Sequence, residues 1–154
     1  MKAPSARTLA RLIAVIDAGS ASVVHARRLL TVPATAAALR RGIKEGWPTA
    51  DLLRLVREMR SNAAHVVRDE DRAAFYAEPT TTGDQRWDAL LAGAVEDLAL
   101  HVGATPPEWT AGHALSTFWF VGSSPSLHAY AFAHTPISMQ VRGVMLDPAD
   151  LESV

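Results

Sequence analysis

Residues 86–103, RWDALLAGAVEDLALHVG, decide the fold. Apolar side chains recur there with the period of an α-helix, at Trp87, Leu90, Leu91, Ala94, Val95, Leu98 and Val102. Polar side chains occupy the opposite side of the same helix, at Asp88, Glu96, Asp97 and His101. Gly103 and Pro106 end the helix, because glycine permits a left-handed turn and proline cannot continue a helix. The pattern predicts an amphipathic helix whose apolar side packs against the rest of the chain.

Length and composition limit the class of protein. A chain of 154 residues, 49% of them hydrophobic, can form one ordinary core or two small helical subdomains. Its apolar runs fall far short of the roughly 18 residues that span a bilayer, so we expect no membrane segment. Cysteine is absent from the sequence, which excludes disulfides, thiolate nucleophiles and cysteine-ligated zinc. Arg11 and Asp17 do not fit a signal peptide, so we expect a cytoplasmic protein.

Charge is divided unevenly along the chain, although the formal net charge is only −1. Residues 1–76 carry 13 Lys and Arg against seven Asp and Glu, a net charge of +6. Residues 77–154 carry two Arg against nine carboxylates, a net charge of −7. This asymmetry indicates a half that binds a polyanion, joined to a half with another role. The alternative is an arginine-rich helical domain whose charges only solvate its surface.

Helical patterns and breaks alternate along the chain. We expect helices or helical turns over residues 5–19, 20–30, 33–45, 49–66, 86–103, 106–109, 125–134, 136–142 and 147–151, and an extended stretch at 144–146. In the helix over 125–134, Leu127, Tyr130 and Ala131 are expected to face inward. The stretch EPTTTGD at 78–84 is the predicted linker, because proline, threonines and glycine in succession cannot hold a helix. The prediction is a mainly all-α protein with an N-terminal helical bundle over 1–77 and a small C-terminal helical domain over 84–154.

The segment 25–47, HARRLLTVPATAAALRRGIKEGW, has the layout of a helix-turn-helix DNA-binding motif. A helix, a break at 31–33 and a second helix would expose basic side chains that contact guanine edges or phosphates. These candidate DNA contacts are Arg27, Arg28, Arg40, Arg41 and Lys44. The rhythm Leu39-Arg40-Arg41…Glu45-Gly46 also resembles the recognition helices of winged-helix regulators. The break, however, lacks the usual glycine, and Pro48 begins another helix where a wing strand should stand. A plain helical bundle is the alternative.

Sequence signatures of catalysis or metal binding are absent. The six histidines lack zinc-binding spacings, and Asp97 with His101 is more typical of a surface hydrogen bond or ion pair than of a metal site. Ser123 and Ser124 do not form a G-x-S-x-G nucleophile elbow, and no phosphate-binding glycine motif is present. We therefore predict no catalytic residue, no metal and no cofactor. An enzyme would have to build its site from scattered carboxylates and histidines.

Aromatic residues gather in the C-terminal half, at Trp109, Phe118, Trp119, Phe120 and Tyr130. One interpretation is a small core packed on the helix that carries Trp87. The other is that part of the set stays exposed and anchors a protein partner, because Trp and Tyr dominate the energetics of interfaces. The predicted anchors are Trp109, Trp119 and Phe120.

Residues 86–154 resemble the C-terminal part of a group of actinobacterial antitoxin-like proteins and helix-turn-helix regulators. The resemblance rests on Trp109, Trp119-Phe120, Pro125-Ser126-Leu127, His134-Thr135-Pro136 and Asp147-Pro148-Ala149-Asp150-Leu151. Over residues 138–142 the group leads us to expect several arginines, but this chain has only Arg142 there. Some members of the group are paired with toxins of the nucleotidyltransferase type.

The resemblance and the charge division together predict a non-enzymatic, antitoxin-like transcriptional regulator. Its basic half would bind operator DNA, as a homodimer that meets two half-sites. Its acidic half would bind a cognate toxin, with carboxylates occupying the cationic site that a toxin acting on RNA or nucleotides needs. The competing hypothesis is a non-catalytic helical scaffold that binds proteins and not DNA.

Overall fold

The computed structural model describes residues 29–122 and 124–152. The helix predicted over 5–19 and nearly all of the helix predicted over 20–30 lie outside these ranges. The described helices are α2 (Val32–Glu45), α3 (Thr49–Ala63), α4 (Asp69–Phe75), α5 (Gln85–His101), α6 (His128–His134) and α7 (Ile137–Gln140). The 3₁₀ turns are η1 (Glu108–Thr110), η2 (Pro125–Leu127) and η3 (Pro148–Leu151), and the strands are β1 (Trp119–Phe120) and β2 (Val144–Met145). The described chain is mostly helical, which confirms the all-α prediction.

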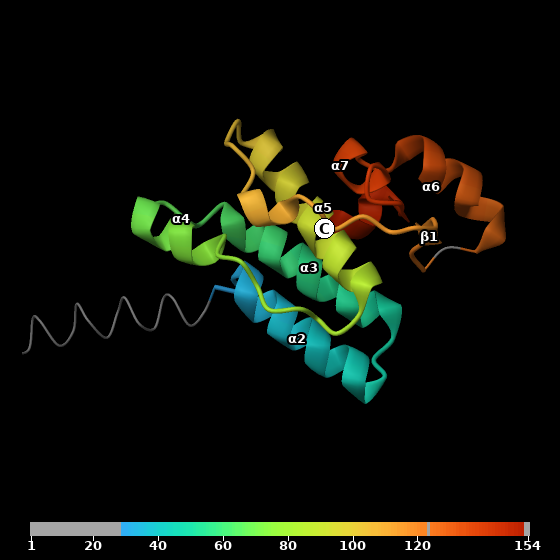
Figure 1. Ribbon diagram of the computed structural model, residues 1–154, viewed down its shortest axis with the longest axis horizontal. Coiled ribbons are helices and arrows are strands. Elements are labelled where there is room, and N and C mark those ends of the chain that lie inside the picture. The colour runs from blue at the N-terminus through green and yellow to red at the C-terminus, as the bar shows by residue number, and fades with distance from the viewer. Residues whose placement is uncertain (1–28, 123, 153–154) are drawn as a thin grey trace, which may run out of the picture.

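α2 and α3 form a helical hairpin (Figure 1). α2 begins at an N-cap threonine, because the Thr31 Oγ1 accepts a hydrogen bond from the Ala34 amide at 3.2 Å. It ends at Gly46, whose φ of +73° suits glycine. Pro48 then caps α3, so a helix follows α2 where a winged-helix protein would have a wing strand.

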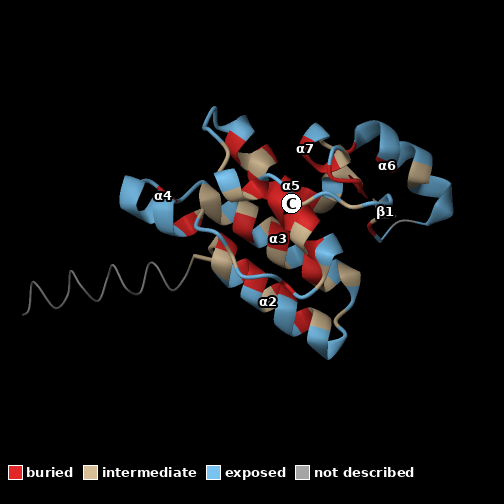
Figure 2. Ribbon diagram, viewed as in Figure 1, coloured by how far each residue is buried: buried red, intermediate tan, exposed pale blue. Residues whose placement is uncertain are grey.

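α5 is the central helix, and it is buried on nearly every side (Figure 2). α2 and α3 contact it, and so do α7, η1 and β2. Its predicted extent is confirmed to within two residues, but its predicted polar side is confirmed only in part, because His101 is exposed whereas Asp97 is buried. Asp97 is only 8% exposed, whereas Val102, which was expected to pack inward, is exposed. A helix that is apolar on almost all faces is the core of a small protein rather than its covering layer.

The predicted linker joins helices that share one hydrophobic core. Val56 of α3, Val95 of α5 and Leu151 of η3 all belong to it. The linker is tied to the first turn of α5, since the backbone amide and the hydroxyl of Thr82 both donate to Asp88 Oδ1 at 2.7 Å. The stretch at 78–84 therefore has a fixed path although it contains no helix.

The C-terminal segment returns to α5 through a short parallel strand pair. Trp119 of β1 pairs with Val144 of β2, which confirms the extended stretch predicted at 144–146. The helix predicted over 125–134 is present as η2 followed by α6, but its inward face is wrong. Leu127 and Tyr130 are 53% and 48% exposed, and only Ala131 of α6 is buried. α6 contacts the rest of the protein along one narrow edge, so its larger side chains remain in solvent.

Candidate binding surfaces

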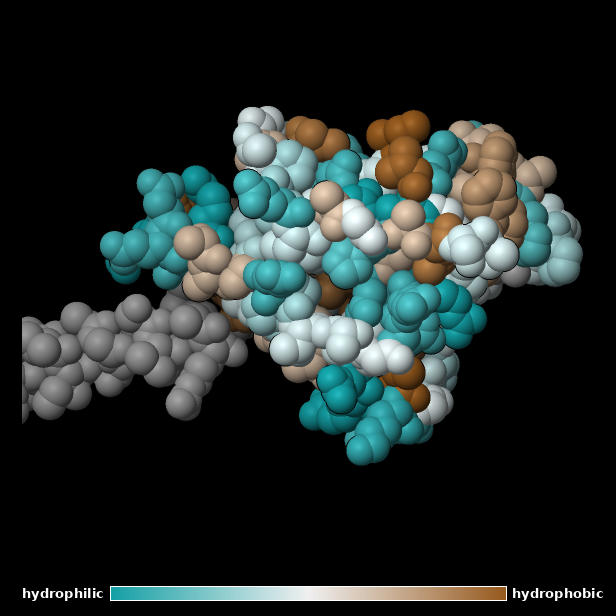
Figure 3. Space-filling view, in the orientation of Figure 1, coloured by the Kyte–Doolittle hydropathy of each residue, from teal (hydrophilic) through white to brown (hydrophobic). Residues whose placement is uncertain are grey.

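The C-terminal end of α2 carries an exposed basic cluster of Arg40, Arg41 and Lys44. None of the three makes an ion pair with any residue that the structure describes. The Arg41 guanidinium lies over the Trp47 ring, 5.5 Å from its centroid. Lys44 lies in the last turn, where a cation interacts favourably with the helix dipole. This end of the molecule is strongly hydrophilic (Figure 3). Arg27 and Arg28 lie outside the described residues.

Other arginines of the basic half are engaged in ion pairs, Arg60 inside the protein and Arg72 at its surface. Arg60 Nη2 lies 2.9 Å from Asp97 Oδ2, and its Nη1 donates to the Ala94 carbonyl oxygen at 3.0 Å. Arg72 pairs with Asp69 at 2.9 Å. The positive charge of this half is therefore not all available to a ligand, and the basic cluster on α2 is its most accessible part.

Several carboxylates of the acidic half are engaged in the same way. Glu96 accepts from Arg142, Asp97 from Arg60, and Asp88 from the two threonines of the linker. Asp84 pairs with Arg86 at 3.0 Å. The hydrogen bond from Arg86 holds the pKa of Asp84 below its ordinary value, and the same contact raises the pKa of Arg86. Much of the negative charge of this half thus holds the fold together.

The three predicted anchors, Trp109, Trp119 and Phe120, are half-buried. The Trp109 Nε1 donates to the Tyr76 carbonyl oxygen at 2.9 Å. The Trp119 ring meets the edge of Trp87 with 5.3 Å between centroids, and the Phe120 ring stacks on His128 at 4.0 Å. Each anchor therefore packs against its own protein and exposes only part of its ring.

A different set of apolar side chains is exposed at this end of the molecule. We name it the C-terminal apolar surface, and it consists of Phe118, Leu127, Tyr130, Phe132, Ile137 and Val141. The rings of Phe118 and Phe132 lie 6.1 Å apart, which joins the residue before β1 to α6. Apolar atoms gather over α6 and α7 in Figure 3. The exposure of most of these residues was not predicted from the sequence, because apolar residues in short helices are usually core residues.

One feature of the sequence does mark this surface. From Trp109 to Leu146 the chain carries a single formal charge, that of Arg142, and this side chain is buried. The histidines of the segment lie against aromatic rings, as His134 does on Tyr130 with 4.0 Å between ring centroids. An exposed segment that is rich in aromatic residues and lacks charged side chains has the composition of a protein–protein interface.

The structure can also be searched for a metal site and a membrane-spanning helix, neither of which the sequence predicts. Among the described residues, no three His, Asp or Glu side chains come together in a way that could hold a metal ion. His101 Nδ1 lies 2.9 Å from the backbone oxygen of Asp97 and 3.5 Å from its Oδ1, as in the predicted surface contact. None of the described helices combines the length and apolarity needed to cross a membrane. Comparisons of the chain with protein-family models, curated proteins and solved structures give no match.

Proposed function

We propose that this protein is a non-catalytic binding protein whose C-terminal apolar surface docks a second protein. The observation that carries the proposal is the stretch from Trp109 to Leu146, which exposes large apolar side chains and no formally charged one. An exposed surface of this kind is costly unless a partner covers it. Burying one large apolar side chain contributes about 1.5–3 kcal/mol, so a few of these residues can supply the core of an interface.

The partner that the resemblance implies is a toxin, which would make the protein antitoxin-like. The ion pairs described above change the expected mode of binding. Because Glu96 and Asp97 are already paired with arginines, carboxylate mimicry of a nucleic acid has fewer groups to work with. Apolar docking through Phe132 and Ile137, with half-buried Trp119 and Phe120 at its margin, is the favoured mode. A scaffold that binds another class of protein would use the same surface.

The test is co-purification with the product of the adjacent reading frame, followed by a binding isotherm. Phe132→Ser combined with Ile137→Ser should lower the affinity at least tenfold, because both are large, exposed apolar side chains of this surface, one on α6 and one on α7. The matched control combines Val67→Ser with Leu100→Ser, which removes two exposed apolar side chains elsewhere. Equal affinity for the two double variants would refute docking at this surface.

A second function, DNA binding, is supported by the basic cluster on α2. Arg40, Arg41 and Lys44 are exposed on one end of a helix, as phosphate contacts need to be. If a homodimer reads two half-sites of an operator, a fragment of the upstream DNA should be shifted in a gel. Replacing the three residues with Gln should weaken this binding. The slope of log affinity against log salt should also become shallower, by about 0.9 for each phosphate that is no longer neutralised.

The control for the DNA experiment is Arg54→Gln with Arg68→Gln, which removes two positive charges from arginines exposed elsewhere on the molecule. DNA binding through α2 predicts a normal shift for this control. Failure of the unaltered protein to shift the DNA, together with retained partner binding, would leave the scaffold function standing and remove the regulator.

A further inference from the structure

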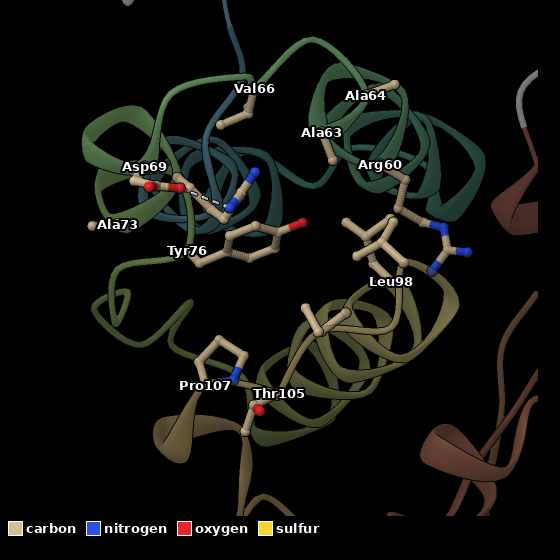
Figure 4. Close-up of a pocket in the computed structure, with 14 residues that line it drawn as sticks. Arg60, Ala63, Ala64, Val66, Asp69, Ala73, Tyr76, Leu98, Thr105 and Pro107 are labelled. Carbon is tan, nitrogen blue, oxygen red and sulfur yellow. Dashed lines mark hydrogen bonds and ion pairs between the residues drawn. The ribbon is translucent and has the colours of Figure 1, made fainter.

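A cavity of about 760 Å³ lies at the end of the molecule opposite α6, between α4 and the C-terminal ends of α3 and α5 (Figure 4). Its walls are mostly apolar and include Ala63, Val66, Leu98, Val102 and Pro107. Cavities of about 300–1,000 Å³ with apolar walls and a few polar groups are typical of sites for small organic molecules. None of the surfaces discussed above includes this cavity.

Tyr76 supplies the polar group inside the cavity. Its ring extends between Ala63 and Leu98, and its hydroxyl has no hydrogen bond or ion pair with another lining residue (Figure 4). The residue is held in place, because its carbonyl oxygen accepts from Trp109 and its ring meets the edge of Phe75 with 4.9 Å between centroids. Burial raises the pKa of Tyr76, so the hydroxyl remains a hydrogen-bond donor at neutral pH.

Two guanidinium groups, those of Arg60 and Arg72, line the same cavity. Asp97 and the Ala94 carbonyl fix Arg60, and Asp69 fixes Arg72. A guanidinium has five N–H donors, which is more than these contacts use. Both positive charges oppose the effect of burial on the pKa of Tyr76, so their field reaches its side chain.

We propose that this cavity binds a small monocarboxylate with an apolar body. The carboxylate would accept the Tyr76 hydroxyl hydrogen and lie in the field of Arg60 and Arg72, while the apolar body lies along Leu98, Val102 and Pro107. A cationic ligand does not fit, because two guanidinium groups and only one carboxylate, that of Asp69, line the cavity. A sugar or a nucleotide does not fit either, because walls made largely of alanine, valine, leucine and proline offer it few hydrogen-bonding groups.

The probe is decanoate, titrated into the full chain below its critical micelle concentration and followed by calorimetry. Decanol and decyltrimethylammonium share the apolar body and differ in the head group. Decanoate should bind at least tenfold more tightly than decanol, and the cation should bind more weakly still. Tyr76→Phe should lower the affinity for decanoate about tenfold, because the hydroxyl then no longer donates to a charged acceptor. It should change the affinity for decanol less.

A matched pair of tryptophan substitutions locates the bound probe. Val102 and Val67 are 67% and 81% exposed, so neither substitution removes core packing, but only Val102 lines the cavity. Val102→Trp should abolish decanoate binding, and Val67→Trp should leave it unchanged. Equal binding of the three probes, an equal loss in the two tryptophan variants, or no binding of decanoate to the full chain would overturn the proposal.

Discussion

The Arg142 guanidinium donates from Nη2 to the Glu96 carboxylate, and this ion pair joins the C-terminal segment to the middle of α5. The same Nη2 also donates to the Thr110 carbonyl oxygen at 2.7 Å, and Nη1 donates to the Ser138 carbonyl. Arg142 is buried, and no other formal charge lies between Trp109 and Leu146. The one charged side chain of the segment therefore serves the fold and leaves the exposed surface uncharged.

Replacing Arg142 should destabilise the protein strongly. Arg142→Met leaves the carboxylate of Glu96 without its partner, so we expect a loss of about 3–5 kcal/mol in the free energy of unfolding, measured with urea. Glu96→Leu added to this variant should recover much of the loss, because the unpaired charge is then absent. The control is Arg86→Met, which breaks the exposed pair with Asp84 and should cost about 1 kcal/mol or less. Similar losses for the two single variants would contradict the structural role of Arg142.

Gly93 marks a close approach of α5 to α7. A Cβ atom at this position would lie 2.8 Å from Met139 Cγ and 3.2 Å from the Ser138 carbonyl oxygen. Helix propensity alone predicts that Gly93→Ala stabilises α5 by about 1 kcal/mol. Because backbone as well as side chain must move, we expect instead a loss of about 1–3 kcal/mol. Thermal unfolding decides the sign, and a rise in the melting temperature would show that the two helices are not this close.

Asp84 should make stability fall in acid. Its pKa is lower in the folded than in the unfolded protein, chiefly because of the hydrogen bond from Arg86. Its contribution is therefore complete above the unfolded pKa, about 3.9, and is lost as the pH falls through the folded value. Asp84→Asn keeps a good N-cap residue and removes the charge. This variant should be less stable than the unaltered protein at pH 7 and equally stable at the acid end of the titration.

Asp150 should have the opposite effect. Burial raises its pKa, the charge of Asp147 adds to the rise, and Arg57 opposes it. Since the folded pKa exceeds the unfolded one, the favourable contribution is complete below the unfolded value and is lost as the pH rises through the folded value. Asp150→Asn should therefore raise the melting temperature at pH 7 and leave it unchanged near pH 3. A lower melting temperature at pH 7 would mean that the attraction to Arg57 dominates.

The extents of α2 and α5 could be predicted because local residues fix them, whereas α3 ends three residues before its predicted end and α4 was not among the expected helices. Thr31 and Gly46 bound α2, and Asp84 caps α5 through a hydrogen bond to the Arg86 amide at 2.8 Å. These signals act within a few residues of the chain, so the sequence displays them directly. The turns at η1, which follows Pro107, and η3, which begins at Pro148, were predicted from the same kind of signal.

The direction in which side chains face was harder to predict, because it depends on neighbours that are distant in the sequence. Asp97 was expected in solvent, but Arg60 of α3 allows it to lie buried. Tyr130 was expected in the core, but α6 has too few packing partners to bury it. Periodicity shows which residues share a side of a helix and cannot show how many sides are covered.

The exposure of the candidate binding residues was likewise predicted for some of them and not for others. Exposure of Arg40, Arg41 and Lys44 followed from the helical pattern of α2 and is confirmed. Phe132 and Ile137 were not predicted as exposed, since apolar residues in short helices are usually core residues. The missing charges between Trp109 and Leu146 were the signal that could have identified them.

The short parallel pairing of β1 with β2 has a consequence for how this protein can change over time. It brings Trp119 beside Val144 and so closes the base of the long loop in which α6 and α7 lie. A loop closed in this way can be lengthened, shortened or rewritten at its tip without disturbing the point where it leaves the core. Only α6, at the tip of the loop, is thereby separable from stability, because α7 and Arg142 pack on α5. Grafting α6 of one variant onto another should transfer the partner while leaving the melting temperature nearly the same.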